Sequence, residues 1–167
     1  GFINTEAQDA AKVVNRLSEF YSEGERDAAF EPIDFNRVIE QVIALTQPLW
    51  RDQALAAGNT ISVSFEQGVV PPVSGLESEL REALTNLMLN AVDAIQKRGT
   101  IILRTGLRDP MVYVEVVDDG IGMTEDVLSQ CLAPFFTSNG AKGSGLGLSM
   151  VNGIVQRHKG QMEIESE

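Results

Sequence analysis

Two strand-like segments follow one another directly in this sequence, with only a turn between them. Residues 101–105 and 112–117 are rich in β-branched side chains, and the intervening Asp109-Pro110 is typical of a turn. A doubly wound sheet needs a helix between consecutive strands, so this order argues against regular alternation of strands and helices. The chain is therefore predicted to have an α+β fold, a two-layer sandwich of one mixed sheet with helices on one face.

The rest of the chain predicts helices and further strands around this pair. Asp34 is placed to cap a helix over 35–57, which Pro48 is expected to kink and Gly58-Asn59 to end. Its predicted buried side consists of Val38, Val42, Leu45 and Leu49. Further predicted elements are a strand at 60–65, a helix at 75–97 ended by Gly99, a short helix at 124–131, a helix at 144–158 and a strand at 162–165.

Residues 3–23 carry apolar side chains at helical spacing and predict an amphipathic helix whose apolar stripe needs a partner. A polar stretch at 24–29 follows and is typical of a linker. We therefore expect an appended segment over 1–29 and the main domain over 30–167.

Composition limits the classes of function. With 167 residues and 43% hydrophobic content, the chain can form one ordinary globular core. Its net charge of −11 argues against nucleic-acid binding, which depends on Lys and Arg. Cys131 is the only cysteine, so no internal disulfide is possible, and its apolar setting predicts burial.

The chain contains no apolar run of the ~20 residues that a membrane span needs, so no membrane contact is expected from it. A cytoplasmic location is expected, although a parent protein could still be membrane-anchored. The chain begins with Gly1 rather than Met, which indicates a fragment.

Two asparagines lie in the middle of the predicted helix at 75–97. Asn86 and Asn90 are four residues apart and share a helix face, with Asp93 nearly on the same face. An amide oxygen is a suitable ligand for Mg²⁺, whereas the alternative is a solvated polar face. The neighbours expected to face the core are Leu84, Leu87, Met88 and Ala91.

An acidic residue ends the predicted strand at 112–117. Asp118 is followed by Gly120 and Gly122, which allow positive φ and close approach of a ligand. A carboxylate there could accept the exocyclic N–H of adenine. The alternative is an ordinary turn at a strand end.

A glycine-rich stretch at 143–148 opens the last predicted helix. Such a turn presents backbone N–H groups and the positive end of a helix dipole, which suits phosphate. It lacks the Gly-Lys-Ser/Thr of a Walker loop and the surrounding βαβ unit of a dinucleotide site. Lys142 could add a cation, or could be a solvated loop residue.

In this order, NLMLNAVDA (86–94), DDGIGM (118–123) and PFFTSNGAKGSGLGL (134–148) resemble the ATP-binding domain of bacterial sensor histidine kinases, most closely the nitrogen-regulation type. The resemblance extends to IVQRHKGQMEIESE, which is similar to the closing helix and strand. It also includes VVNRLSEFY and FEPIDFNRVIEQV, which look like the end of the dimerisation hairpin running into the catalytic domain.

The resemblance implies a Bergerat-type fold that binds ATP and Mg²⁺. Asn90 would coordinate the metal, Asn86 would assist near the phosphates, and Asp118 would bind the adenine amine. Phe135 and Phe136 would anchor a mobile lid over 134–147. The implied site comprises Asn86, Asn90, Asp93, Asp118, Gly120, Gly122, Met123, Phe136, Thr137, Lys142, Gly143, Ser144, Gly145, Leu146, Gly147 and Leu148.

The sequence departs from the family pattern at several positions. Ala133 stands where glutamate is common, Lys159 stands where glycine is usual, and the chain stops at Glu167 before a further expected strand. Its single histidine, His158, matches the closing motif and not the phosphoacceptor motif.

The implied activity is transfer of the γ-phosphoryl group of ATP to a histidine of a dimerisation domain outside this chain. We therefore expect no autophosphorylation of this polypeptide alone. The implied partners are that domain and a response regulator, and the parent protein would be a homodimer. One alternative is a true ATPase of the same superfamily, although Asn86 stands where those proteins have a glutamate base. Another is an anti-sigma-type serine kinase or binding module.

Overall fold

The computed structural model describes residues 29–136 and 145–167. The chain divides into two units, Gly1–Phe30 and Glu31–Glu167, and every described element belongs to the second. The helix predicted at 3–23 lies outside the described residues. In chain order the elements are β1 (Glu31–Ile33), α2 (Phe35–Gln47), the π-helical turn η1 (Pro48–Gln53), α3 (Ala54–Ala56), β2 (Thr60–Glu66), β3 (Val73–Gly75), α4 (Glu77–Ala94), β4 (Arg98–Arg108), β5 (Met111–Asp118), α5 (Glu125–Gln130) and α6 (Gly147–Arg157).

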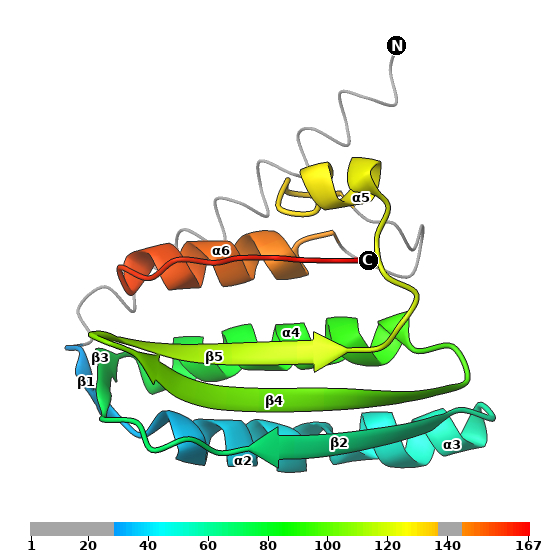
Figure 1. Cartoon of the computed structure of the whole chain (residues 1–167), viewed down its shortest axis with the longest axis horizontal. Helices are drawn as coiled ribbons and strands as arrows, with labels where there is room; N and C mark the ends of the chain where they lie inside the picture. The colour runs from blue at the N-terminus through cyan, green and yellow to red at the C-terminus, as the bar shows by residue number, and fades with distance from the viewer. Residues whose placement is uncertain (1–28, 137–144) are drawn as a thin grey trace. The chain divides into compact units, whose positions relative to one another are not determined.

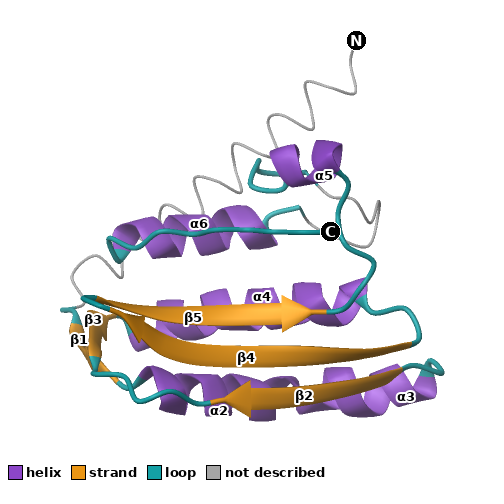
Figure 2. Ribbon diagram, viewed as in Figure 1, coloured by secondary structure: helices purple, strands orange, loops and turns teal. Residues whose placement is uncertain are grey.

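The main sheet has three strands in the order β2-β4-β5. β2 runs parallel to β4, whereas β5 runs antiparallel to it, so the sheet is mixed. β1 and β3 form a separate two-stranded antiparallel sheet. Helices α2 and α4 lie behind the three strands in Figures 1 and 2, on one face of the sheet. The predicted α+β fold, with a mixed sheet covered by helices on one face, is confirmed.

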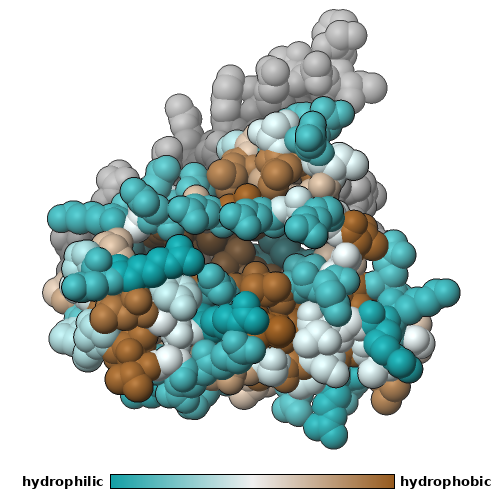
Figure 3. Space-filling model, in the orientation of Figure 1, coloured by the Kyte–Doolittle hydropathy of each residue, from teal (hydrophilic) through white to brown (hydrophobic). Residues whose placement is uncertain are grey.

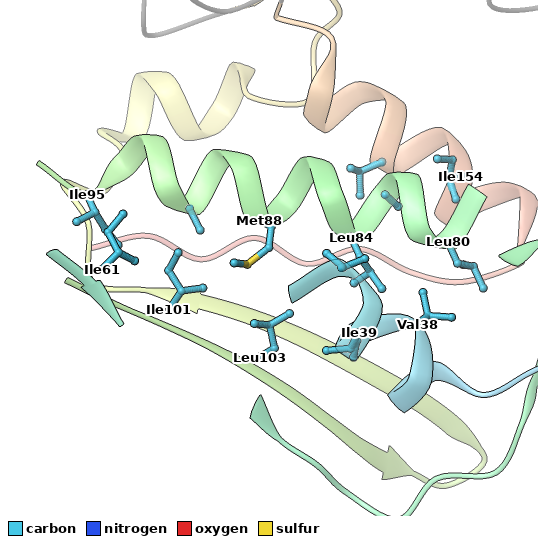
Figure 4. Close-up of a cluster of buried hydrophobic side chains, with 14 of the residues drawn as sticks. Val38, Ile39, Ile61, Leu80, Leu84, Met88, Ile95, Ile101, Leu103 and Ile154 are labelled. Atoms are coloured by element: carbon cyan, nitrogen blue, oxygen red, sulfur yellow. The ribbon is translucent and has the colours of Figure 1, made fainter. Parts of the chain in front are cut away.

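The core lies between the sheet and its helices. Met88 and Leu84 of α4 point toward Ile101 and Leu103 of β4, and Ile39 of α2 lies beside them (Figure 4). Four of these five side chains have no exposed surface, and Leu84 is 4% exposed. Strand β4 is central, since it pairs with β2 along one edge and with β5 along the other. Alternate side chains of β4 are buried.

The predicted helix at 35–57 forms as three successive pieces. Asp34 caps it as expected, since its Oδ1 accepts the N–H of Arg37 at 3.3 Å. The break falls at Pro48, where α2 gives way to the π-helical turn, because proline cannot supply the N–H of a continuous helix. Leu45 was predicted to be buried but is 63% exposed. Thr46 takes that place on the buried face, and its hydroxyl donates to the carbonyl of Val42 at 2.7 Å.

The helix predicted over 75–97 is shorter in the structure than predicted. α4 ends at Ala94, whose carbonyl accepts the N–H of Ile121 at 3.0 Å. Gly99, predicted to end the helix, already lies in β4 opposite Ile61. A Cβ there would lie 2.5 Å from Oδ1 of Asp119, so a larger residue would displace that side chain.

The strand predicted at 162–165 is not formed as a ladder strand. Side chains at 161–167 alternate between exposed and half-buried, as in a strand, but the structure assigns no sheet pairing to this described segment. Alternation decides which side chains are covered and does not by itself pair the main chain. The pairing of the short strands β1 and β3 was not predicted.

The outer face of the sheet carries a chain of ion pairs. Arg104 on β4 bonds Glu66 on β2 and lies 3.7 Å from Glu115 on β5, which also pairs with Arg108 at 3.5 Å. Glu66 raises the pKa of Arg104 through its hydrogen bond and its charge. Arg108 also covers the ring of Tyr113, 4.9 Å from its centroid. Apolar and hydrophilic side chains are interspersed over this view of the molecule, typical of a solvated surface (Figure 3).

Candidate functional site

The two asparagines of α4 lie on its polar side, next to the helix face that is packed into the core. Leu80, Ala83, Leu84, Met88 and Ala91 are buried on that face, and Leu87 is half-buried against the core. Asn86 is half-buried and Asn90 is exposed. The Nδ2 group of Asn86 donates to the carbonyl of Glu82 at 3.1 Å and lies 3.9 Å from the sulfur of Met150. The amide of Asn86 therefore lies beside α6.

The start of α6 lies against these two amides. A Cβ placed on Gly147 would be 3.7 Å from Oδ1 of Asn86 and 3.8 Å from both polar atoms of the Asn90 amide. The first N–H groups of a helix have no acceptor within the helix, and the N-cap Leu146 has only an aliphatic side chain. The structure therefore brings a helix N-terminus and two carboxamides to one place, although Asn90 and Gly147 are far apart in sequence.

The loop after β5 packs on the C-terminal end of α4. The Oδ1 atom of Asp118 accepts the N–H of Gly120 at 2.9 Å. A Cβ on Gly120 would be 2.6 Å from both the Cβ and the carbonyl oxygen of Ala94. Gly120 is therefore required by close packing on α4. Only Gly122 of the two has the expected positive φ, at 66°.

Asp118 ends β5 as predicted, and β5 is mostly half-buried. Asp118 is exposed, and its carboxylate bonds Gly120, which packs on Ala94 at the C-terminal end of α4. The segments with Asn86, Asn90, Asp118 and Gly147 all meet along α4.

Sequence reasoning missed Asp119. Its Oδ1 accepts the N–H of Thr100 at 2.7 Å, and its own N–H donates to the carbonyl of Thr100 at 3.3 Å. These two bonds tie the loop after β5 to the start of β4 and so hold Asp118 in position. The signal in the sequence was a second acid directly after the strand, beside a glycine-rich turn.

The two described ends of the segment 134–147 meet each other. Phe135 donates its N–H to the carbonyl of Gly145 at 2.9 Å, and both residues have φ of 66°. Phe136 donates to the carbonyl of Ala133 at 3.2 Å. The predicted site residues that lie outside the described part of the chain are Thr137, Lys142, Gly143 and Ser144.

The remaining predicted residues are spread around this arrangement. Asp93 is exposed on α4, and Leu146 and Leu148 are half-buried at the start of α6. Met123 is half-buried, and its N–H donates to Oγ of Ser166 at 2.7 Å. Within the described residues, no helix has both the length and the apolar character needed to cross a membrane.

Known proteins share both the sequence and the fold. Residues 75–167, more than half of the chain, match the family described as histidine kinase-, DNA gyrase B-, and HSP90-like ATPase. The sensor histidine kinase ZraS of Klebsiella oxytoca is 34% identical over 163 residues, which cover 96% of this chain and 33% of that protein. The chain therefore spans about a third of the length of this curated relative.

Two solved structures have similar folds. The mycobacterial sensor histidine kinase MprB matches with a TM-score of 0.64 at 28% identity, covering 78% of this chain and 80% of that chain. The catalytic domain of histidine kinase ThkA matches with a TM-score of 0.65 at 25% identity, covering 77% and 81%. The chain belongs to the histidine kinase-, DNA gyrase B- and HSP90-like ATPase family, as the catalytic, ATP-binding domain of a sensor histidine kinase.

Proposed function

We propose that this domain binds ATP with Mg²⁺ and donates the γ-phosphoryl group to a histidine of a dimerisation domain. The observation that carries the proposal is the position of Gly147 beside the side chains of Asn86 and Asn90. It joins a helix N-terminus, which favours anions, to two oxygen donors of the kind that Mg²⁺ prefers. The proposal extends to a response regulator as the partner that receives the phosphoryl group from the parent kinase.

The described residues fit a metal that is held mainly through its nucleotide. Among them, no group of three or more His, Cys, Asp or Glu side chains could hold a metal ion. Mg²⁺ commonly uses one or two protein oxygens and completes its shell with phosphates and water. Asn90, which is exposed and next to Gly147, is the residue we assign to this role, with Asn86 beside it.

Each remaining part of the site has a proposed role in binding. The carboxylate of Asp118 would accept an N–H of the exocyclic amine of adenine. Gly120, which packs closely on α4 and donates its N–H to Asp118, would hold that carboxylate near the end of the helix. Gly145 and Gly147 would present backbone N–H groups to the phosphates. ATP would supply the phosphoryl group, and Mg²⁺ would neutralise the charge on its phosphates.

Transfer to histidine is favoured over hydrolysis by the residue one turn before Asn90. Asn86 occupies this position, and an amide cannot accept the proton that a water nucleophile must lose. A neutral imidazole is already nucleophilic, so positioning and charge neutralisation supply most of the catalysis. Glu82 lies one further turn back and is the candidate base for the rival ATPase. A steady-state ATPase rate abolished by Glu82→Gln would favour hydrolysis.

Calorimetric titration with Mg·ATP tests the proposed site. We expect Asp118→Ala and Asn90→Ala each to weaken binding about fivefold or more, since each removes a polar contact worth ~1–3 kcal/mol. Arg104→Gln, on the outer face of the sheet, is the control and should bind as the wild type does. Unchanged affinity of Asp118→Ala would contradict the adenine assignment.

The absence of an acceptor motif gives a second test. The only histidine, His158, has a side chain that is 6% exposed, so incubation with γ-labelled ATP should leave this polypeptide unlabelled. Label should appear on an added dimerisation domain with an acceptor histidine. An anti-sigma-type serine kinase would instead label a serine of its partner, which acid stability of the phosphate distinguishes.

A further inference from the structure

A buried carboxylate lies at the end of α4 that is remote from the candidate nucleotide site. Glu79 is only 4% exposed. Its Oε1 accepts from Arg157, 3.1 Å from Nε and 2.9 Å from Nη2, and its Oε2 lies 3.7 Å from Nδ1 of His158. A buried carboxylate is costly unless it is paired and hydrogen-bonded, so this cluster joins the start of α4 to the end of α6.

The ring of His158 is held by two backbone groups. Its Nε2 accepts the N–H of Leu76 at 3.0 Å, and its Nδ1 lies 2.8 Å from the carbonyl oxygen of Ile154. The N–H of Leu76 can donate only to an unprotonated Nε2, and the carbonyl of Ile154 can accept only from a protonated Nδ1. Together they define the neutral tautomer that carries its proton on Nδ1. Gly75 leaves the space for this ring, because a Cβ there would be 2.7 Å from its Cδ2.

The same two helices form the candidate site at their other ends. α4 and α6 run antiparallel: Glu79 meets Arg157 near one end, Asn86 meets Met150 further along, and Gly147 reaches Asn90 at the other. α6 has 11 residues and is therefore about 16 Å long. A displacement of α6 along α4 at the histidine end would move the glycine turn relative to the asparagines.

Directional contacts specify the position of α6 along α4 more narrowly than apolar packing does. Val151 and Ile154 of α6 are buried in the same cluster as Leu80 and Leu84 of α4. Such contacts hold the two helices together but are non-directional, whereas a hydrogen bond between fixed donor and acceptor atoms specifies one position. The bonds from the Leu76 N–H to His158 and from Arg157 to the buried Glu79 are both directional in this sense, and the first involves a fixed backbone donor.

We propose that His158, supported by Glu79, is a positioning residue for the nucleotide site. It fixes α6 along α4 and thereby the approach of Gly147 to Asn86 and Asn90. This inference rests on the proposed function, since it concerns the geometry of the same Mg·ATP site. His158 is assigned no contact with nucleotide, so it is not a catalytic residue.

Two substitutions separate positioning from general stability. In His158→Gln the amide can lie where Nε2 lies and its oxygen can accept from Leu76, whereas the shorter side chain in His158→Asn reaches only the position of Nδ1. Calorimetric titration with Mg·ATP should give a Kd that is roughly three- to thirtyfold higher for His158→Asn, the range of coupling through a packed helix. His158→Gln should stay within about twofold of the wild type.

A core truncation on α2 serves as the matched control. Ile39→Val removes one methylene from a side chain with no exposed surface and should lower stability without changing the Kd. If Ile39→Val weakens binding as much as His158→Asn does, or if His158→Asn binds as tightly as the wild type, the inference fails while the proposed function stands. If the wild type itself does not bind Mg·ATP, both fail.

A measurement on the unmodified chain covers the case in which His158→Asn does not fold. Because His158 is the only histidine, its ring nitrogens give isolated ¹⁵N signals. These should show the tautomer protonated at Nδ1, and they should shift when the protein is saturated with Mg·ADP. The other tautomer, or signals unchanged at saturation, would overturn the inference.

Discussion

Phe135 and Gly145 are joined by a backbone hydrogen bond of 2.9 Å, and the backbone of each is in the left-handed region, with φ of 66°. A Cβ on Gly145 would lie 2.5 Å from the carbonyl carbon of Phe135. The approach of the two chain segments at this point therefore depends on glycine, both for its backbone conformation and for its lack of a side chain.

The first prediction compares two glycines of this turn. Gly145→Ala should lower the free energy of unfolding by at least about 1–2 kcal/mol, because the left-handed conformation alone costs that much and the methyl group also meets backbone. Gly147→Ala should not destabilise, since the nearest atoms to its Cβ are 3.7 Å away. It should nevertheless weaken Mg·ATP binding, because the methyl faces Asn86 and Asn90. Urea unfolding and calorimetry measure the two effects, and equal stability of Gly145→Ala and wild type would contradict the first.

The second prediction concerns the end of α6. Lys159 has φ of 56°, and the N–H groups of Lys159 and Gly160 donate to the carbonyls of Gln156 and Val155, at 2.9 Å each. This is a Schellman motif, whose left-handed position favours glycine. Lys159→Gly should therefore stabilise the fold by about 0.5–1 kcal/mol in urea unfolding. Lys159→Ala is the control and should bring no such gain.

The third prediction concerns the two sides of α2. Ile39 has no exposed surface, whereas Leu45 is 63% exposed. Ile39→Ala should lower the free energy of unfolding by about 2–5 kcal/mol through lost burial and a cavity. Leu45→Ala should change it by less than about 0.5 kcal/mol. Similar losses for the two variants would show that Leu45 is buried as its sequence position first indicated.

The fourth prediction concerns the only thiol. Cys131 is 7% exposed, and burial raises its pKa above the ordinary value. The thiolate is the reactive form, so modification by a disulfide reagent should be slow at pH 7 and should accelerate only above the ordinary thiol range. Stopped-flow absorbance from pH 7 to 10 measures this, with the urea-unfolded chain as the reference. Equal rates for folded and unfolded chains at pH 7 would contradict the burial.

Features that depend on neighbouring residues in sequence were predictable. Asp34 as a helix cap, the turn at Asp109-Pro110 and the position of Asp118 at a strand end were all predicted, because the signals for them are local. The order of strands and helices also gave the fold class, since adjacent strands exclude regular βαβ alternation.

Features decided by distant contacts were not predictable in the same way. α4 ends at Ala94, whose carbonyl accepts the N–H of Ile121, and Gly99 packs against the side chain of Asp119. The buried side of α2 is rotated away from Leu45 toward Thr46, which apolar spacing alone does not indicate. Asp119 and Glu79 act through partners brought close only by the fold.

The central place of β4 in its sheet has a consequence for how the domain opens. Residues 101–104 are paired with β2 on one side and with β5 on the other. Amide protons in such a position exchange with solvent only through the largest opening of the molecule, whereas those at the rims exchange through local fluctuations. Deuterium should therefore enter this sheet from its edges inward, and the slowest amides of 101–104 should report the free energy of global unfolding.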